Sequence, residues 1–190
     1  MKKILIAAIV GVSVMFAATP ANALISVGVD IPILFTPNST LATGDTLTAN
    51  GMRLSASIIG IGVGTMTFNV TDGAATNSIG GDFSLFDLWF GLPLPIPFVD
   101  VAVGFGLGSG TSSTYLTSQG YTTTAGFYTF VQGGISILPM TSVTFALYDL
   151  GLTTASLTPG FDPITQQVTV TPTTLDLGGQ AVSVGVEVGF

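Results

Sequence analysis

The sequence predicts an all-β fold, a closed antiparallel transmembrane β-barrel with about eight strands. Only 7% of the 190 residues are charged and 47% are hydrophobic, whereas a soluble domain carries about 25% charge. The 25 glycines and 10 prolines, together with frequent Ser and Thr, suit strands and turns better than helices. Apolar residues recur at every second position in several segments, which is typical of a strand with one apolar face.

The first 23 residues are interpreted as a cleaved secretory signal peptide. Lys2 and Lys3 precede the largely apolar run 4–18, and an A-x-A cleavage motif ends at Ala23. The alternative is a membrane anchor, but these 15 residues are fewer than the roughly 20 apolar residues that span a bilayer. Cleavage after Ala23 is therefore the preferred interpretation.

Residues 1–23 are thus expected to be removed, and residues 24–190 to form one outer-membrane β-barrel domain. This domain has one basic residue, Arg53, against ten acidic residues, which gives a formal charge of −9. The scarcity of Lys and Arg argues against nucleic acid as a partner and against a polybasic membrane anchor. Cys and His are absent, which removes thiol nucleophiles, His-based triads and nearly every zinc or iron site. We therefore single out no catalytic residue, no metal site and no cofactor.

Strands are expected along the whole domain. No stretch after Ala23 contains 18 consecutive apolar residues, which excludes helical membrane spans. The expected strands cover residues 24–34, 50–58, 61–71, 83–91, 98–108, 121–137, 142–157 and 175–190. Alternation is clearest in residues 25–33, 99–107 and 182–190, where Val, Ile, Leu or Phe fills every second position. The positions between them hold mostly small residues with rare charges, which suits a narrow barrel interior.

Turn and loop signals distinguish the two ends of the expected barrel. Tight turns are expected at residues 60–62, 93–97 and 138–141, and longer loops at 35–49, 72–82, 109–120 and 158–174. Outer-membrane barrels have short periplasmic turns and long extracellular loops. Residues 166–170 also alternate, and they are interpreted as part of the last loop or of an extended hairpin. Closure is required, because an open sheet edge in hydrocarbon leaves backbone groups unsatisfied.

The C-terminal segment 178–190 resembles the closing strand of bacterial outer-membrane barrels. It ends in a C-terminal Phe preceded by alternating valines, namely Val182, Val184, Val186, Val188 and Phe190. The segment 97–108 is similar to strands of small eight-stranded porin-like families, such as the OmpA-type transmembrane domain and OmpW-like proteins. The resemblance implies a Gram-negative outer membrane reached by Sec-type export. It implies outer-membrane lipids and the barrel assembly machinery as partners, with this last strand as the assembly signal.

The sequence also departs from those families. It has no periplasmic peptidoglycan-binding domain, which argues against wall anchoring, and few Arg, Lys and Tyr residues. It lacks the His that lipid A deacylase barrels place in their active sites. The resemblance therefore supports fold and location, and it does not indicate an activity.

Four charged residues are expected to face the barrel interior. Alternation places Asp30, Arg53, Asp100 and Glu187 opposite their apolar neighbours, and a charge at membrane depth should avoid lipid. They are interpreted as a lumen ion-pair network, with a polar path for a small solute as the alternative. Since strands one and eight become neighbours on closure, Arg53 is predicted to reach Asp30 or Glu187. Asp100 is the less favoured partner, because its strand lies across the barrel.

The remaining acidic and aromatic residues are assigned to the barrel's outer parts. An acidic rim is expected from Asp45, Asp72, Asp82, Asp149, Asp162 and Asp176, whereas the facing of Asp87 is left open. A divalent-cation site bridging lipopolysaccharide is the alternative for the rim, without supporting spacing. Interfacial girdles are expected from Phe83, Phe86, Trp89, Phe90, Phe127, Tyr128 and Phe130. A hydrophobic ligand pocket is the alternative for these aromatic residues.

The leading functional hypothesis is a non-enzymatic outer-membrane barrel with a structural role, or with passive handling of small or hydrophobic solutes. An eight-stranded interior is just wide enough for side chains, so a broad diffusion pore is not expected. One alternative is a lipid-modifying outer-membrane enzyme that uses Asp or Glu with Ser. Another is a secreted β-rich adhesin or fibre subunit that never enters a membrane.

Overall fold

Strands dominate the computed structural model of the chain, as the alternating sequence pattern predicts. The structure describes residues 25–38, 47–72, 79–92, 96, 98–138, 140–162 and 167–190, and at residues 123, 157–162 and 167–172 it describes the backbone alone. The expected signal peptide, Asp45 and most of the 93–97 turn lie outside the described residues. None of the helices in the described part is long and apolar enough to cross a membrane.

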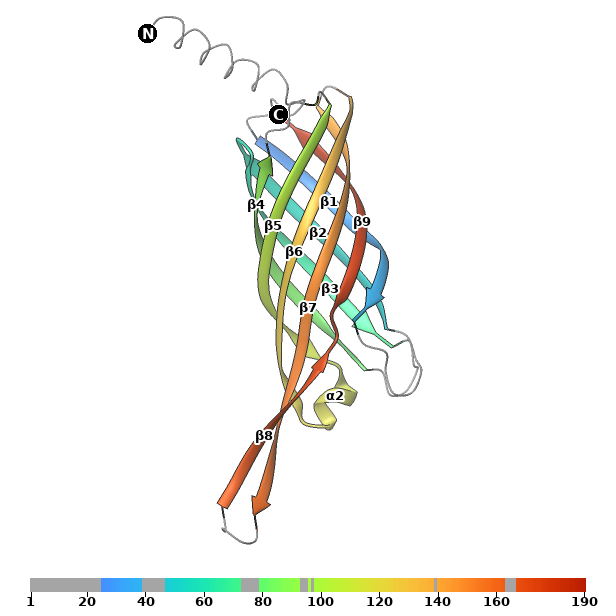
Figure 1. The fold of residues 1–190 in the computed structure, drawn as a ribbon. Coiled ribbons are helices and arrows are strands. Elements are labelled where there is room, and N and C mark those ends of the chain that lie inside the picture. The colour runs from blue at the N-terminus through green and yellow to red at the C-terminus, as the bar shows by residue number, and fades with distance from the viewer. Residues whose placement is uncertain are drawn as a thin grey trace, which may run out of the picture.

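Nine strands and one short helix are seen within these ranges. They are β1 (Ile25–Pro37), β2 (Thr48–Ile58), β3 (Ile61–Thr71), β4 (Gly80–Leu92), β5 (Val99–Ser112), α2 (Thr114–Ser118), β6 (Tyr121–Leu138), β7 (Thr141–Asp162), β8 (Gln167–Asp176) and β9 (Gly179–Gly189). Strands β1 to β6 each pair with the next in antiparallel fashion. Strand β9 pairs with both β1 and β7, and β6 pairs with β7, so the ring closes (Figure 1). The predicted closed eight-stranded antiparallel barrel is confirmed.

Strand β8 extends β7 into a hairpin beyond the barrel (Figure 1). Asp176 pairs with Thr153 and Gly179 pairs with Leu150, so the register on β7 is unchanged between β8 and β9. β8 and β9 therefore follow one continuous path along β7, with an interruption after Asp176. The expected last strand, residues 175–190, corresponds to the end of β8 together with β9. The expected extended hairpin around residues 166–170 is present.

The β2–β3 turn, the start of β1 and the end of β9 lie together at one end of the molecule (Figure 1). Ile59 and Gly60 connect β2 to β3 with φ of 51° and 75°, as a two-residue hairpin with two left-handed residues requires. Phe190 N–H donates to Ile25 C=O at 2.8 Å, which joins the last residue to the first described one. We call this end the turn end, and the opposite end, with the β7–β8 hairpin, the loop end.

Helix α2 lies at the loop end and was not expected from the sequence. Ser113 caps it by accepting a hydrogen bond from Leu116 N–H at 3.3 Å. Leu116 is buried, so this single turn closes over the interior. A helix this short carries too little periodicity to be predicted from sequence.

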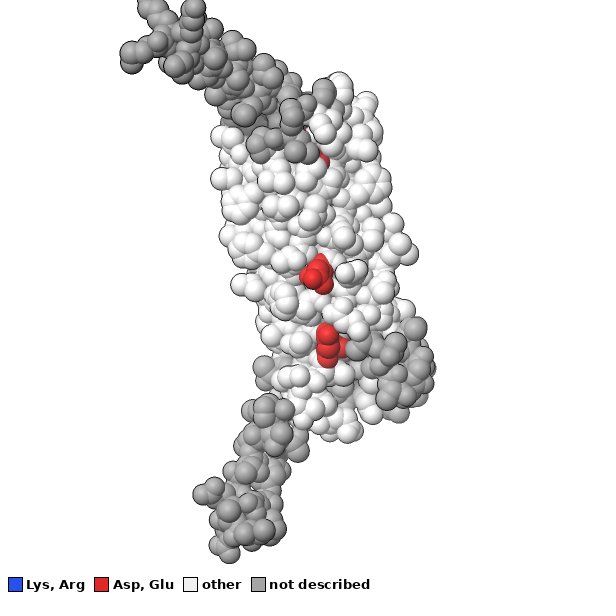
Figure 2. Space-filling view, in the orientation of Figure 1, with Lys and Arg blue, Asp and Glu red and all other residues white. Residues whose placement is uncertain are grey.

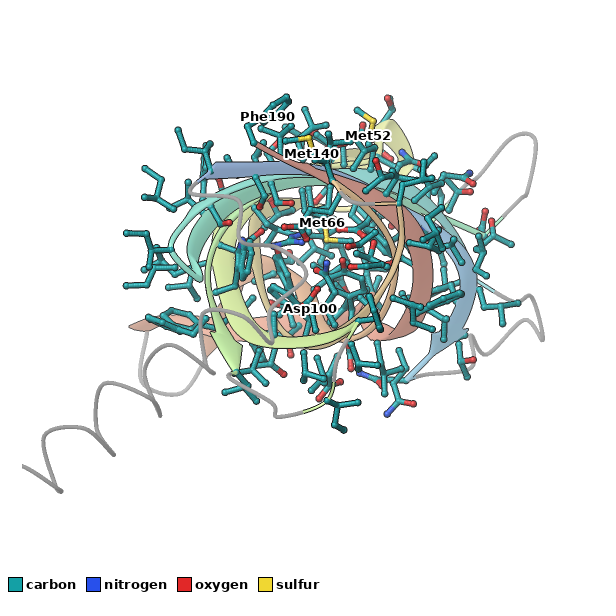
Figure 3. All side chains as sticks on the ribbon, turned by 90° about the horizontal axis from the view of Figure 1, so that it is seen from above. Met52, Met66, Asp100, Met140 and Phe190 are labelled. Atoms are coloured by element: carbon teal, nitrogen blue, oxygen red, sulfur yellow. The ribbon has the colours of Figure 1, made fainter. Side chains whose placement is uncertain are left out.

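Side chains alternate between the interior and the outside along most of each strand, with a break in β1 where a register shift leaves both Ile33 and Leu34 exposed. Along the barrel axis (Figure 3), Met66 and Asp100 lie inside the ring, whereas Met52, Met140 and Phe190 are 43%, 59% and 67% exposed on the outside. The outer face is apolar from the turn end through the middle of the barrel. This band includes Val27, Val29, Leu54, Val63, Phe86, Leu88, Phe105, Val131, Phe145 and Leu147, all exposed.

Toward the loop end the outward positions become polar. On β2 the series Ile58, Leu54, Met52 is followed by Asn50, and on β7 Leu147 is followed by Asp149. Asp149 is exposed on the outer wall of the barrel. On the face shown in Figure 2, isolated acidic patches stand on an otherwise uncharged surface without any basic group. An apolar band with a polar boundary is the arrangement of a barrel immersed in lipid.

The predicted aromatic girdles are partly wrong. Phe86 and Phe90 on β4 and Phe127 on β6 are exposed in the outer band. The other four aromatic residues of that prediction are buried in the interior, namely Phe83, Trp89, Tyr128 and Phe130. The reason is the period of two along a strand, which sends neighbouring aromatic residues to opposite faces.

Candidate functional site

The charged cluster of the lumen is centred on Arg53. Alternation on β2 turns Arg53 inward between the outward residues Met52 and Leu54. Asp30 lies directly opposite on β1, because the register of these two strands pairs the two residues. Arg53 is 0% exposed. The strand pattern and the register together place this cation inside the barrel, as predicted.

Two carboxylates hold the guanidinium. Arg53 Nη1 donates to Asp30 Oδ2 at 3.0 Å. Nη2 and Nε donate to Asp87 Oδ1 and Oδ2 at 2.8 and 3.0 Å, a bidentate pairing that the planar fork of arginine favours. Asp87 comes from β4, so the cluster already connects three strands. Both aspartates are buried.

Strand β6 completes the contacts of Arg53 from across the lumen. Gln132 Oε1 accepts a hydrogen bond from Nη1 at 3.1 Å. Arg53 Cζ lies 4.4 Å from the centroid of the Phe130 ring, which is within the range of a cation–π contact. The cluster therefore crosses the barrel from β1 and β2 to β6.

Hydroxyl groups satisfy the rest of the carboxylate oxygens. Tyr128 on β6 donates to Asp87 Oδ2. Thr144 Oγ1 on β7 donates to Asp30 Oδ1 at 2.7 Å. Each of the four carboxylate oxygens thus accepts at least one hydrogen bond, from Arg53, Tyr128 or Thr144.

Three aromatic rings pack beside the charges. Tyr128 lies 5.8 Å from Phe130 and 5.7 Å from Tyr148 between ring centroids, and Phe130 lies 5.4 Å from Tyr148. A side chain on Gly106 of β5 would collide with the Tyr128 ring, so this position requires glycine. Gly104 is similar, because its side chain would meet the Phe130 ring, whereas side chains at Gly108 and Gly110 would meet the backbone of β4.

Beyond the charged cluster, the loop-end half of the lumen is filled with apolar side chains. We call this set the apolar plug; it comprises Met66, Phe68, Val70, Phe83, Leu85, Leu150 and Leu152, each at most 2% exposed. Leu47, which precedes β2, and Leu116 of α2 belong to the same packed cluster, and both are 3% exposed. The interior toward the loop end is thus a hydrophobic core and not a water-filled channel.

Asp100 and Glu187 lie inside the barrel but outside the Arg53 cluster. Asp100 pairs with Gly134, near the turn end of β5 and β6. Glu187 pairs with Gly28, two residues closer to the turn end than Asp30. Both side chains are half-buried. Of the two partners predicted for Arg53, the structure places Asp30 in contact; among the described residues, the salt bridges of Arg53 are those to Asp30 and Asp87.

Sequence reasoning missed most members of the Arg53 cluster. For Asp87 a signal was present, since it lies between Phe86 and Leu88, and a charge opposite two apolar neighbours belongs inside. Tyr128, Gln132 and Thr144 carried no such signal, because polar uncharged residues occur on both faces of these strands. Only the register of the closed sheet brings them to the same level.

The closing strand has the expected surface. Val182, Val184, Val186 and Val188 are on the outer face of β9, at least partly accessible, and Phe190 follows them at the turn end. The outer face of this strand continues the apolar band onto its neighbours β1 and β7. Its role as an assembly signal remains a prediction.

Comparison with known proteins supports the fold. No protein-family model matches the chain, and no curated protein matches it. The chain is similar to the crystal structure of Neisserial surface protein A, with a TM-score of 0.56 and 13% identity over 87% of this chain and 97% of that one. It is also similar to outer membrane protein W of E. coli, with a TM-score of 0.49 and 12% identity over 88% and 98% of the two chains. At 13% identity the likeness to Neisserial surface protein A shows the fold alone.

Proposed function

We propose that this chain is a non-enzymatic structural protein of the bacterial outer membrane, a barrel whose lumen is closed. The Arg53 cluster carries this proposal. Its contacts reach from β1 and β2 to β4 and β6, so they occupy the cross-section of the barrel. A polar solute on the axis would have to separate Arg53 from two buried aspartates. Breaking one side of a buried ion pair costs about 3 to 5 kcal/mol.

The apolar plug adds a second barrier on the loop-end side. Water or an ion would have to enter a region lined by side chains that are at most 2% exposed. The two barriers differ in chemistry, since one is charged and the other is apolar. A solute that passes one of them easily is opposed by the other.

Passive handling of a small hydrophobic solute is the second candidate. The observation that favours it is the apolar composition of the plug itself, which extends from Leu85 to Leu116 beneath α2. Such a solute could enter only if α2 and Leu116 moved. It would then have to leave the lumen on the loop-end side of the Arg53 cluster. The tight packing of the plug favours the structural role.

The outer surface supports location in the outer membrane. The apolar band, the expected signal peptide and the closing strand with Phe190 each fit export and assembly into that membrane. Outer-membrane lipids and the barrel assembly machinery are the partners that follow from this location. Membrane fractionation tests it: a detergent-dependent, heat-modifiable band supports the barrel, whereas a salt-soluble protein supports the secreted adhesin.

The closed lumen is tested by the permeability of liposomes that contain the folded protein. We expect the wild type to admit neither ions nor small sugars above the level of empty liposomes. A double variant, Arg53→Ala with Asp87→Ala, should remain impermeable to sugars because the apolar plug is intact. The outward variant Asp82→Ala is the matched control. Free passage of ions or sugars through the wild type would overturn the structural role, and selective uptake of a hydrophobic dye would favour the second candidate.

A further inference from the structure

The turn end of the barrel exposes large apolar side chains on its turns. The connections β2–β3, β4–β5 and β6–β7 lie at this end together with the C-terminus, because successive strands run in opposite directions. Turns that face water are usually rich in Gly, Asn, Asp and Ser. Here the connections and the C-terminus carry six large apolar side chains that are 50% to 67% exposed, namely Ile59, Ile96, Phe98, Leu138, Met140 and Phe190. An exposed apolar surface of this kind marks a contact with lipid or with another protein.

Two of these residues stand at backbone positions that disfavour them. Ile59 has a φ of 51° and Phe98 a φ of 66°. This left-handed region is uncommon for residues other than glycine, and it is costly for a β-branched or bulky side chain. In the β2–β3 turn, an asparagine or aspartate before Gly60 would relieve the cost. The geometry of the turn therefore does not explain Ile59, whereas an apolar environment around the turn would offset the cost.

The apolar turns continue the lipid-facing band without a polar boundary between them. Outward positions are apolar throughout residues 182–190 on β9 and at the following end, and throughout residues 25–34 on β1. Toward the loop end, the same two strands become polar on the outside at Gln180 and Thr36, which are both exposed. The outer surface of the barrel thus has a polar boundary at the loop end and an apolar edge at the turn end.

The lengths of these apolar segments agree with a membrane that reaches the turns. They cover nine residues on β9 (182–190) and ten on β1 (25–34). A transmembrane strand needs about 9 to 11 residues to cross the hydrocarbon core. With one edge of the hydrocarbon at the polar boundary beside Gln180, the other edge falls at the ends of the strands. The turns then lie in the headgroup region, which extends beyond the hydrocarbon on each side.

We propose that the turn end of the barrel is inserted in lipid, so that its turns contact the phospholipid leaflet on the periplasmic side of the membrane. This inference rests on the outer-membrane location proposed above, since the short turns of such barrels are periplasmic. Each of the eight barrel strands begins or ends at one of the three turns or beside Phe190. The apolar residues therefore encircle the mouth of the lumen. Lipid surrounds a barrel on all sides, whereas a protein docked from one side would cover only part of this circle.

The mouth of the lumen also disfavours a second copy stacked end to end. Asp100 and Glu187 lie inside the ring at this end and are half-buried. A second copy would bring its own two carboxylates against them. Arg53 is the one basic residue of the expected mature domain, and it is bound to aspartates deeper in the lumen. Burial of unpaired charges is strongly unfavourable, whereas the hydrated headgroup region leaves the mouth in contact with water.

The test places a tryptophan at the turn end of the folded protein in bilayers of brominated lipid. In a chain whose native Trp89 is replaced by Phe, the variant Phe98→Trp should be quenched more by lipid brominated near the glycerol than near the methyl end of the acyl chain. Phe86→Trp in the same background reports on the apolar band and should also be quenched. Thr111→Trp is the control for water, because Thr111 is exposed on the outer face near the loop end. It should be quenched by acrylamide and hardly by lipid.

A second measurement uses the sign of a stability change at the β2–β3 turn. In water, Ile59→Asn would stabilise the turn, because asparagine tolerates the left-handed conformation. In lipid, the same change removes an apolar contact, so we expect a lower urea midpoint for unfolding from bilayers. Ile59→Leu is the matched control: it keeps an apolar side chain without the β-branch, and its midpoint should not fall.

Quenching of Phe98→Trp by acrylamide but not by brominated lipid would overturn the proposal, because the turn would then lie in water. Resistance to both quenchers would overturn it as well, by showing that a second copy covers the turn end. A higher urea midpoint for Ile59→Asn would contradict lipid around that turn. A lack of lipid quenching in Phe86→Trp would instead refute the membrane location itself, so the two failures are distinguishable.

Discussion

Replacing Arg53 by methionine removes the centre of the charged cluster. The side chain makes hydrogen bonds to Asp30, Asp87 and Gln132 and stacks on Phe130. The variant would leave two carboxylates in the interior without their cation. Breaking buried pairs in this way costs about 3 to 5 kcal/mol. For a domain of this size the loss corresponds to a fall of about 6 to 20 °C in the unfolding temperature.

The assay is thermal unfolding of the detergent-folded barrel, followed by circular dichroism and by the shift of the heat-modifiable band on a gel. Arg53→Lys should lose part of the stability, because an ammonium keeps the charge but cannot form the two-pronged contact with Asp87. A triple variant, Arg53→Met with Asp30→Asn and Asp87→Asn, should recover stability relative to Arg53→Met alone. An Arg53→Met barrel within about 0.5 kcal/mol of the wild type, the range of an ordinary surface change, would refute the reasoning.

Three further outcomes follow from the fold. Gly106→Leu should prevent folding because its side chain meets the Tyr128 ring, whereas Gly133→Ala should be tolerated because no atom lies within 4 Å of the added Cβ; refolding yield on a gel measures both. Deletion of Phe190 should lower the outer-membrane fraction without reducing secretion, and unchanged membrane abundance would contradict its role in assembly. Deletion of residues 158–173 should leave a heat-modifiable barrel, because the removed part of β7 lies beyond Ser156, the last residue of β7 that pairs with β6; loss of the band would show that the hairpin supports the barrel.

Much of the fold could be predicted because alternation is a local property. The period of two along β1, β5 and β9 identifies strands with one apolar face, and the low charge indicates lipid as the surrounding solvent. The same period placed Asp30 and Arg53 inside. Since strands one and two are consecutive antiparallel neighbours, the contact between Arg53 and β1 also followed from the topology.

The rest of the cluster depends on non-local register. Gln132 is 79 residues from Arg53 in sequence, and it reaches Nη1 only because eight strands close into a ring with the correct stagger. The inward facing of Trp89 and Tyr128 was missed, because an aromatic residue fits both the lipid interface and a barrel core. Glu187 was expected near Arg53, but the register sets it two residues nearer the turn end than Asp30.

The measurement that tests the inside–outside arrangement most directly uses the one tryptophan of the chain. Trp89 is 6% exposed and faces the lumen, whereas Phe86 on the same strand is 70% exposed in the apolar band. In bilayers of brominated lipid, the fluorescence of native Trp89 should be hardly quenched. The variant Trp89→Phe with Phe86→Trp should be quenched strongly, because its indole contacts the acyl chains. Strong quenching of native Trp89, or none in the variant, would contradict a membrane barrel whose charged cluster faces inward.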